Sequence, residues 1–375
     1  PLPMPIKAAA FAPSGEKIED LTLLLESDEL VWSVTDQPAR PLVSLNRGFS
    51  APIRLDHQIH DDQVLALTQV DDDPFNQWNS LQALIKKDIL ALAYEGKADA
   101  DTAVVSAIAA AVRANRNDPA FAALLTRLPD VGELFLEHIP ANPRALSDAR
   151  DLVQRALATE LAADAKEILA TPSPSPFKPD AEQSGARALR TAMITLVGAT
   201  GGEKSDTALR EAFEAAPNMT ESLACLRALC IADSASTAES IETFAEKWTS
   251  NPLVMDKWFA VQASTGSVED VAKLLEHGDF DLGNPNRVRS VVAVFAMQNL
   301  AAFHAPDGAG YRLVTDVICR ADAINPALAA RLLTAFEQWK SLEPQARGEA
   351  ETALKALRDK DLSKNASDII TRTLG

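Results

Sequence analysis

Six dipeptides in which Asp or Asn precedes proline recur along this chain of 375 residues. The Asp or Asn side chain accepts hydrogen bonds from the free N–H groups of a first helical turn. Proline fits the next position because its missing N–H would have no partner there. Apolar residues at helical spacing follow each pair, as in Trp78, Leu81, Ile85 and Ile89. The pairs are Asp73-Pro74, Asp118-Pro119, Asn142-Pro143, Asn251-Pro252, Asn284-Pro285 and Asn325-Pro326. From residue 61 onward the sequence therefore predicts helices, about 15 of them if most have the mean length of roughly 11–12 residues.

The predicted helices start at uneven intervals, so no repeat of fixed period emerges. This favours an irregular, right-handed type of α-superhelix built from antiparallel helix pairs, similar to a solenoid but without its period. One Pro/Ser-rich segment, residues 171–179, interrupts the helical pattern. We expect it to form an extended surface loop.

The first 60 residues follow a different pattern, in which short segments of strand-favouring residues alternate with turn residues. Four or five short strands predict a small antiparallel β-sandwich, although about 60 residues make a marginal one. The segments are 6–11, 21–25, 30–34, 42–45 and 52–55. The chain starts at Pro1 without a methionine and enters a strand almost at once, so we expect it to continue a longer polypeptide.

Charge and composition exclude several classes of partner. The chain has 36 Lys+Arg against 53 Asp+Glu, a formal net charge of −17, which argues against nucleic-acid binding. Its best apolar run, residues 291–297, is too short to span a membrane, and the N-terminus has no secretory signal pattern. The cysteines are odd in number and lack a CxxC pair, which favours reduced thiols in a cytoplasmic protein. They are Cys225, Cys230 and Cys319.

Motifs for catalysis, phosphate binding and metal binding are absent from the sequence. HExxH, GxSxG, GxxxxGK[ST] and GxGxxG do not occur, and residues 198–202 are glycine-rich but are expected to form a plain loop. His57 and His60 are the only close histidine pair. On the strand predicted there they would point to opposite faces, which is wrong for sharing a metal. His304 could donate a proton, but a packed or capping role is favoured. We therefore expect no catalytic residue, metal or cofactor in this chain.

One segment departs from a local rule of helix formation. After Asn284-Pro285, Arg287 and Arg289 fall in or near the first helical turn, where the helix dipole disfavours positive charge by roughly 0.3–1 kcal/mol each. Two guanidinium groups at a helix N-terminus could bind a carboxylate bidentately. Alternatively, both are solvated or pair with acids such as Asp279 or Asp281. Arg144 follows Asn142-Pro143 in the same way and weakens the functional interpretation.

Several blocks, in order and at matching intervals, resemble the C-terminal region of bacterial aminopeptidase N, a family of gluzincin zinc aminopeptidases. The likeness covers nearly the whole chain. The blocks are Phe75-Asn76-Gln77-Trp78, Ala158-Thr159-Glu160-Leu161, Met219-Thr220, Leu253-Val254-Met255-Asp256-Lys257-Trp258-Phe259, Asn284-Pro285-Asn286-Arg287-Val288-Arg289-Ser290, Ala301-Ala302-Phe303-His304-Ala305, Asp307-Gly308 and Gly310-Tyr311.

The resemblance implies that the chain is the non-catalytic end of a four-domain exopeptidase. Residues 1–60 would be the later strands of an Ig-like β-sandwich, and residues 61–375 a helical domain that closes over the active site and forms the substrate chamber and channel. The zinc, its HExxH ligands and the GAMEN motif would belong to a catalytic domain upstream on the same polypeptide. That domain and peptide substrates would be the partners of this chain.

The resemblance also implies specific residues of the substrate channel. Arg289 matches an arginine that faces the chamber in family members, and Arg331 matches another. Asn284, Asn286 and Arg287 belong to the same block and are expected at the channel with Arg289. Some relatives carry a glutamine near the substrate where this sequence has Ala327, so the fine specificity is left open.

A second function stays open at this point. The chain could be a free-standing scaffold of helical repeats that binds a protein partner in its groove. An in-frame HExxH upstream of Pro1 would favour the enzyme, whereas a start codon at Met4 would favour the scaffold.

Overall fold

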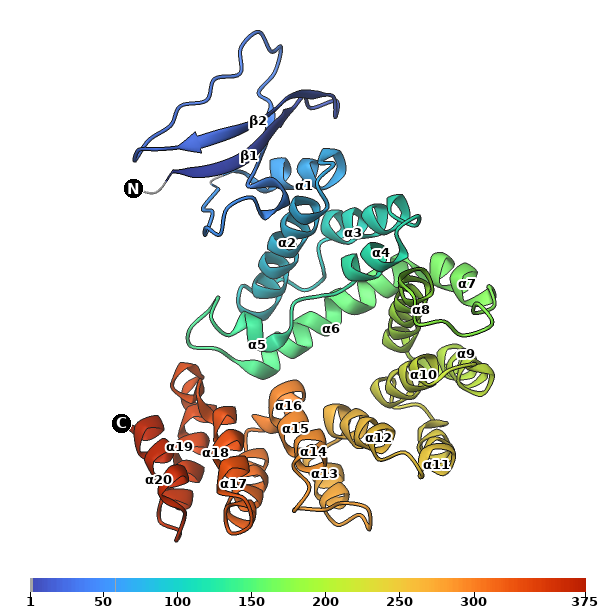
Figure 1. Cartoon of the computed structure of the whole chain (residues 1–375), viewed down its shortest axis with the longest axis vertical. Helices are drawn as coiled ribbons and strands as arrows, with labels where there is room; N and C mark the ends of the chain where they lie inside the picture. Colours follow the sequence, from blue (N-terminus) through green and yellow to red (C-terminus); the bar gives the residue numbers. More distant parts are fainter. Residues whose placement is uncertain (1–2, 58) are drawn as a thin grey trace. The chain divides into compact units, whose positions relative to one another are not determined.

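The computed structural model describes residues 3–57 and 59–375 (Figure 1). The predicted fold class is confirmed: the protein is mainly α-helical, with a small antiparallel sheet near the N-terminus. Close contacts divide the chain into two compact units, and helices α6 (Pro143–Glu160), α7 (Ala162–Ala170) and α8 (Ala181–Thr200) contribute residues to both. The first unit contains the residues up to Pro129 with Leu152–Ala163 and Pro174–Ala192, and the second contains Asp130–Asp151, Asp164–Ser173 and Met193–Gly375.

The sheet of the first unit has three strands in the order β2-β1-β3, with β1 (Met4–Phe11) pairing antiparallel to both neighbours. Figure 1 shows β1 beside β2. Ala8 lies opposite Leu21 of β2 (Lys17–Leu25) and opposite Leu45 of β3 (Leu42–Leu45). Residues 8–11 of β1 are buried, and Phe11 packs with Leu42 and with Leu67 from helix α1. The apolar end of β1 is thus covered by the first helix.

A charged network joins the sheet to the first two helices. The Arg47 guanidinium, on the short helix η1 (Arg47–Phe49), contacts Asp71 Oδ1 at 2.6 Å and also pairs with Asp72. Lys17 Nζ on β2 lies 2.6 Å from Asp72 Oδ2. Asn76, in the first turn of α2, donates to Ser44 Oγ at 2.7 Å and to the Leu45 carbonyl at 2.9 Å. Asp71 and Arg47 are buried, so this network compensates the charges that the fold removes from water.

All six predicted Asx-Pro pairs start helices. In five of them the geometry is the same: the Asp or Asn side chain accepts a backbone N–H of the first turn, and proline follows as the first helical residue. In the sixth, Asn142 Oδ1 accepts the Ala145 N–H at 3.0 Å. The Ser267–Asp270 capping box is present as well. The helices at the N-terminal end are α1 (Asp61–Val70), α2 (Pro74–Tyr94), α3 (Thr102–Ala114) and α4 (Pro119–Leu125).

Helices joined by short loops and turns make up most of the rest of the described chain. Successive helices pack against one another, as α9 against α10 and α17 against α18. In chain order they are α5 (Val131–Leu134), α6 (Pro143–Glu160), α7 (Ala162–Ala170), α8 (Ala181–Thr200), α9 (Gly202–Ala215), α10 (Met219–Ile231), α11 (Thr237–Trp248), α12 (Pro252–Thr265), α13 (Val268–Leu275), α14 (Pro285–Val288), η2 (Arg289–Ala293), α15 (Val294–Gln298), α16 (Leu300–Phe303), α17 (Ala309–Asp322), α18 (Pro326–Leu332), η3 (Leu333–Phe336), η4 (Trp339–Ser341), α19 (Pro344–Arg358) and α20 (Lys364–Leu374).

Three local predictions are wrong. Segments 30–34 and 52–55 form no strand: Val31 is 78% exposed, and strand-favouring residues do not form a ladder without a partner strand. No strand holds His57 and His60 either, and His60 instead precedes the first residue of α1. The predicted loop at 198–202 is partly helical, because Gly198 lies inside α8. A Cβ there would come within 2.9 Å of the Ala228 side chain on α10, so the glycine permits close helix packing.

The second unit contains a link between segments that are 200 residues apart. Ala141 forms a parallel bridge with Leu342, and its N–H donates to the Ser341 carbonyl at 2.8 Å. The Glu343 N–H donates back to the Ala141 carbonyl at 2.9 Å. Asn142 Nδ2 adds a bond of 2.9 Å to Glu343 Oε2. We call residues 141–142 and 341–343 the seam; it joins the segment before α6 to the segment before α19.

Candidate functional site

The block from Asn284 to Arg289 begins a helix that changes its winding. Asn284 Oδ1 accepts the N–H groups of Asn286 at 3.0 Å and of Arg287 at 3.4 Å, and Pro285 is the first helical residue. After one turn of α14, η2 is a π-helical turn that starts at Arg289, and α15 follows. Single π-helical turns inside helices are frequent at functional sites. The block therefore sets Arg289 at the point where the helix widens.

Arg287 is held inside the second unit. Its Nε lies 2.7 Å from Asp256 Oδ1, its Nη1 donates to the Asp279 carbonyl, and its guanidinium stacks 4.4 Å from the Phe259 ring centre. The side chain is only 7% exposed. Pairing with acidic residues, the alternative stated from the sequence, describes Arg287, and these contacts give it a structural role.

Arg289, two residues further on, is exposed. Its Nη2 donates to Asn286 Oδ1, and among the described residues it forms no ion pair. Because Asn286 is neutral, the positive charge of Arg289 is not compensated by its neighbour. The block thus separates its two arginines: Arg287 belongs to a buried ion pair, whereas Arg289 is exposed and has no ion pair among the described residues.

Arg331 is exposed near the end of α18, where its carbonyl accepts the Thr334 hydroxyl at 2.8 Å. Within the described residues no hydrogen bond or ion pair connects it with the block 284–289. Of the five predicted channel residues, the structure therefore brings Asn284, Asn286, Arg287 and Arg289 together on one helix start, with Arg331 on a separate helix. Whether any of them lines a channel stays a prediction.

His304 is packed in an aromatic cluster, and its side chain is hydrogen-bonded to a tyrosine. Its Nδ1 lies 2.6 Å from the Tyr311 hydroxyl, and its ring contacts those of Phe303 and Phe135. Burial lowers the pKa of His304 to about 3, so the imidazole is neutral at physiological pH. Burial, with Glu349 and Glu343 nearby, raises the pKa of Tyr311, which keeps its phenol protonated. A proton-donating role at neutral pH is thus disfavoured for His304.

The His, Cys, Asp and Glu side chains of the described residues do not cluster as metal ligands do. Within residues 3–57 and 59–375, no three His, Cys, Asp or Glu side chains are grouped so that they could hold a metal ion. No disulfide joins Cys225, Cys230 and Cys319 within the described residues. Burial raises the pKa of Cys230 to about 11, which makes it a poor nucleophile at neutral pH. No helix in the described part of the chain is both long and apolar enough to cross a membrane.

The sequence did not indicate the seam or the His304–Tyr311 pair. Asn142 was recognised as a helix cap, but nothing in its neighbourhood along the chain points to Glu343 as its second partner. The histidine and the tyrosine are seven residues apart in a block with a family resemblance, which was the only signal available.

Comparisons with known proteins agree with the fold. Residues 61–375 match the family described as "Domain of unknown function (DUF3458_C) ARM repeats", and residues 1–58 match "Domain of unknown function (DUF3458) Ig-like fold". The chain is 33% identical over 373 residues to an aminopeptidase N of Caulobacter vibrioides, covering 97% of this chain and 43% of that protein. It is 31% identical over 343 residues to an aminopeptidase N of Escherichia coli, covering 89% of this chain and 39% of that protein.

A solved structure is also similar. The crystal structure of Legionella pneumophila aminopeptidase A in complex with aspartic acid matches 99% of this chain and 45% of its own, with 28% identity and a TM-score of 0.85. The resemblance to the C-terminal region of bacterial aminopeptidase N is thereby confirmed. The chain spans less than half the length of the relatives named above.

Proposed function

The chain belongs to the DUF3458 family, with an Ig-like part followed by an ARM-repeat part, and on this premise we propose that it is the non-catalytic C-terminal part of a zinc metalloaminopeptidase. The whole protein would release N-terminal residues from peptides. Residues 1–60 would belong to the β-sandwich, and residues 61–375 would cap the active site and form the wall of the substrate chamber and channel. The catalytic domain would lie upstream on the same polypeptide, and we propose a cytoplasmic location.

The zinc of such an enzyme would be held outside this chain. The described residues offer no cluster of His, Cys, Asp or Glu that fits a metal ion, so no step of the reaction is assigned to them. Their proposed contribution is binding: they would limit entry to short or unfolded peptides and orient them by charge. Arg331 would act with Arg289 in this way.

The observation that carries the proposal is the contrast between the two arginines of the block. Arg287 is committed to Asp256 and Asp279, whereas Arg289 is exposed with only neutral Asn286 as a partner. A positive charge near a helix N-terminus without an acidic partner lowers the stability of the fold. The presence of Arg289 at this position therefore supports a functional role for it. The guanidinium can bind a peptide carboxylate in two parallel hydrogen bonds, or a backbone carbonyl in one.

The test uses Arg289→Ala in the full-length protein. Short peptides with a free C-terminus should show a Michaelis constant raised about tenfold, the effect of one lost charge-assisted hydrogen bond. Amidated peptides of the same sequence should show a smaller rise, because they have no carboxylate. Arg331→Ala should act in the same direction.

Arg320→Ala is a matched control, because Arg320 is exposed on α17 and pairs with Asp316 at 3.4 Å. Its kinetics should equal those of the unaltered protein. An unchanged Michaelis constant and turnover in Arg289→Ala, over several peptides, would remove Arg289 from the site. A full-length protein without aminopeptidase turnover would instead favour the alternative function, a helical-repeat scaffold for a protein partner.

A further inference from the structure

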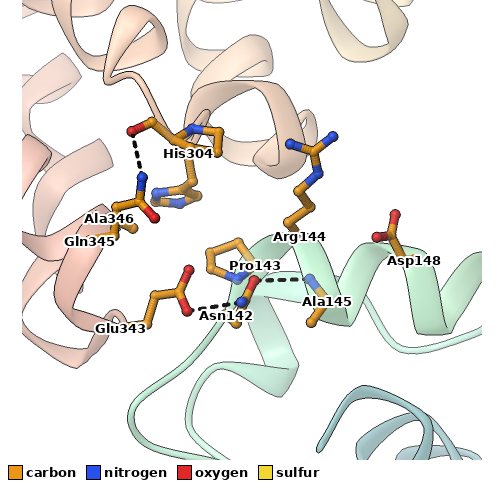
Figure 2. Close-up of a pocket in the computed structure, with 10 residues that line it drawn as sticks. Asn142, Pro143, Arg144, Ala145, Asp148, His304, Glu343, Gln345 and Ala346 are labelled. Carbon is orange, nitrogen blue, oxygen red and sulfur yellow. Dashed lines mark hydrogen bonds between the residues drawn. The ribbon is translucent and has the colours of Figure 1, made fainter.

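A pocket of about 300 Å³ lies beside the seam, within the second unit (Figure 2). The start of α6, the segment after α16 and the start of α19 line it. Its polar side chains are those of Asn142, Arg144, Asp148, His304, Glu343 and Gln345. The volume equals that of roughly ten water molecules, so the pocket suits a ligand of about ten non-hydrogen atoms.

The buried histidine presents an N–H donor to this pocket. Among the described residues the Tyr311 hydroxyl has only His304 Nδ1 as a partner, and the tyrosine is fully buried. If Nδ1 carried the proton, the phenol O–H would have no acceptor, at a cost of roughly 1–3 kcal/mol. The phenol therefore donates to Nδ1, and the proton of the neutral imidazole sits on Nε2. His304 lines the pocket, and Figure 2 shows its ring between Pro143 and the Glu343 and Gln345 side chains.

The pocket is also lined by an arginine, Arg144, that has no ion-pair partner among the described residues. Arg144 lies in the first turn of α6, where the helix dipole disfavours its charge, and it is exposed. Asp148 is four residues further along the same helix, at a spacing that permits an ion pair, but the two form none. Within the described residues Arg144 has no ion pair or side-chain hydrogen bond, so its guanidinium is available to a ligand.

Negative charge is available on the other pocket walls. Glu343 accepts one hydrogen bond, from Asn142 Nδ2 to its Oε2, and its second oxygen has no partner among the described residues. Asp148 is exposed. Gln345 is already committed, because its Nε2 donates to the Pro306 carbonyl at 3.2 Å. The pocket thus combines two donors, Arg144 and His304, with two carboxylates.

We propose that this pocket binds a free α-amino acid in its zwitterionic form. The α-carboxylate would accept from the Arg144 guanidinium and from His304 Nε2–H, and the α-ammonium would donate to Glu343, whose side chain lies beside the His304 ring (Figure 2). A phosphate or other multiply charged anion would be repelled by the two carboxylates, and a polyamine by Arg144. The inference rests on residues of the second unit alone and does not depend on the proposed function.

The test follows L-leucine binding at this pocket and not elsewhere in the molecule. In the full-length protein with ¹³C-labelled alanine methyl groups, the signals of Ala145 and Ala346, which line the pocket, report on it. Substitution of each alanine by serine assigns its signal. L-leucine should shift both signals saturably. Isopentylamine, which lacks the carboxylate, and 4-methylpentanoate, which lacks the ammonium, should each bind at least about tenfold more weakly.

Variants that remove the charge of one group at a time provide the second arm. Arg144→Gln and Glu343→Gln should each weaken L-leucine binding about tenfold or more, since each removes a charge-assisted hydrogen bond. Arg210→Gln on α9, whose arginine pairs with Glu214 at 2.7 Å, is the control and should bind as the unaltered protein does. Absence of saturable shifts, or equal affinity for leucine and either analogue, would overturn the proposal. Should a variant fail to fold, the three ligands still decide it on the unaltered protein.

Discussion

Replacing Arg287 with methionine tests the assignment of this arginine to the fold and not to a ligand. Methionine keeps the aliphatic packing of the arginine stem but removes the guanidinium. Three contacts are lost: the 2.7 Å pair with Asp256, the bond to the Asp279 carbonyl and the stacking on Phe259.

The expected loss of stability follows from the burial of both partners. Removing one member of a buried ion pair costs about 3–5 kcal/mol, and a cation–π contact contributes roughly 0.5–2 kcal/mol. The Asp256 side chain is 17% exposed, so water can partly solvate it after the change. We therefore expect Arg287→Met to lower the free energy of unfolding by about 3 kcal/mol, near the low end of the range for buried pairs. Arg289→Met should lower it by less than about 0.5 kcal/mol, because that side chain is exposed.

The assay is urea unfolding of the full protein, followed by tryptophan fluorescence and circular dichroism. Trp258 packs against Phe259 and reports on this region. Adding Asp256→Asn to Arg287→Met should recover about 1 kcal/mol or more, because the carboxylate left without a partner is then removed. Equal stabilities of Arg287→Met and Arg289→Met would refute the reasoning, since the structural difference between the two arginines would then have no energetic consequence.

Two further predictions concern the block around His304. The pKa of His304 is lowered by burial to about 3 in the folded protein, against about 6.5 when unfolded, so the unfolded state binds the proton first and stability falls as pH drops below about 6.5. Unfolding titrations should therefore show that the free energy of unfolding falls between pH 6.5 and pH 5 by about 2 kcal/mol more in the unaltered protein than in His304→Gln. Equal decreases in the two proteins would contradict the burial of a neutral ring. Gly310→Ala should destabilise by about 1–3 kcal/mol or more, because its Cβ would lie 2.3 Å from the Phe303 carbonyl oxygen. Gly348→Ala in α19 should stabilise by about 0.5–1 kcal/mol, because a Cβ at Gly348 would meet nothing within 4 Å. Thermal unfolding of both variants checks these predictions. A Gly310→Ala variant as stable as the unaltered protein would argue against the close approach of Gly310 to Phe303.

Helix starts were the part of the fold most fully predicted from the sequence. An Asx-Pro pair determines its own cap, because the side chain, the proline and the N–H groups that it serves lie within four residues of one another. Strands were predicted less well. Residues 42–45 pair with β1, but residues 30–34, of similar propensity, find no neighbouring strand, and propensity cannot supply one.

The candidate site shows the same limit. The sequence identified Arg287 and Arg289 as a pair that violates a helix preference, and one alternative was that both are solvated or pair with acids such as Asp279 or Asp281. It could not say that Arg287 takes the buried position, because Asp256 is 31 residues away along the chain. Nor could it show that Arg289 keeps a neutral partner.

The sequence by itself determined the capped helix starts, the change from strands to helices near residue 60 and the family resemblance, because these depend on short-range patterns and on blocks of residues in sequence. Only the tertiary structure decided which side chains meet across long separations: Ala141 with Leu342, Asn142 with Glu343, and His304 with the residues around Arg144. The physical reason is that these contacts depend on the packing geometry of many successive helices. Each packing angle and each close approach, such as Gly198 against Ala228, is set by side-chain volumes that no local pattern records.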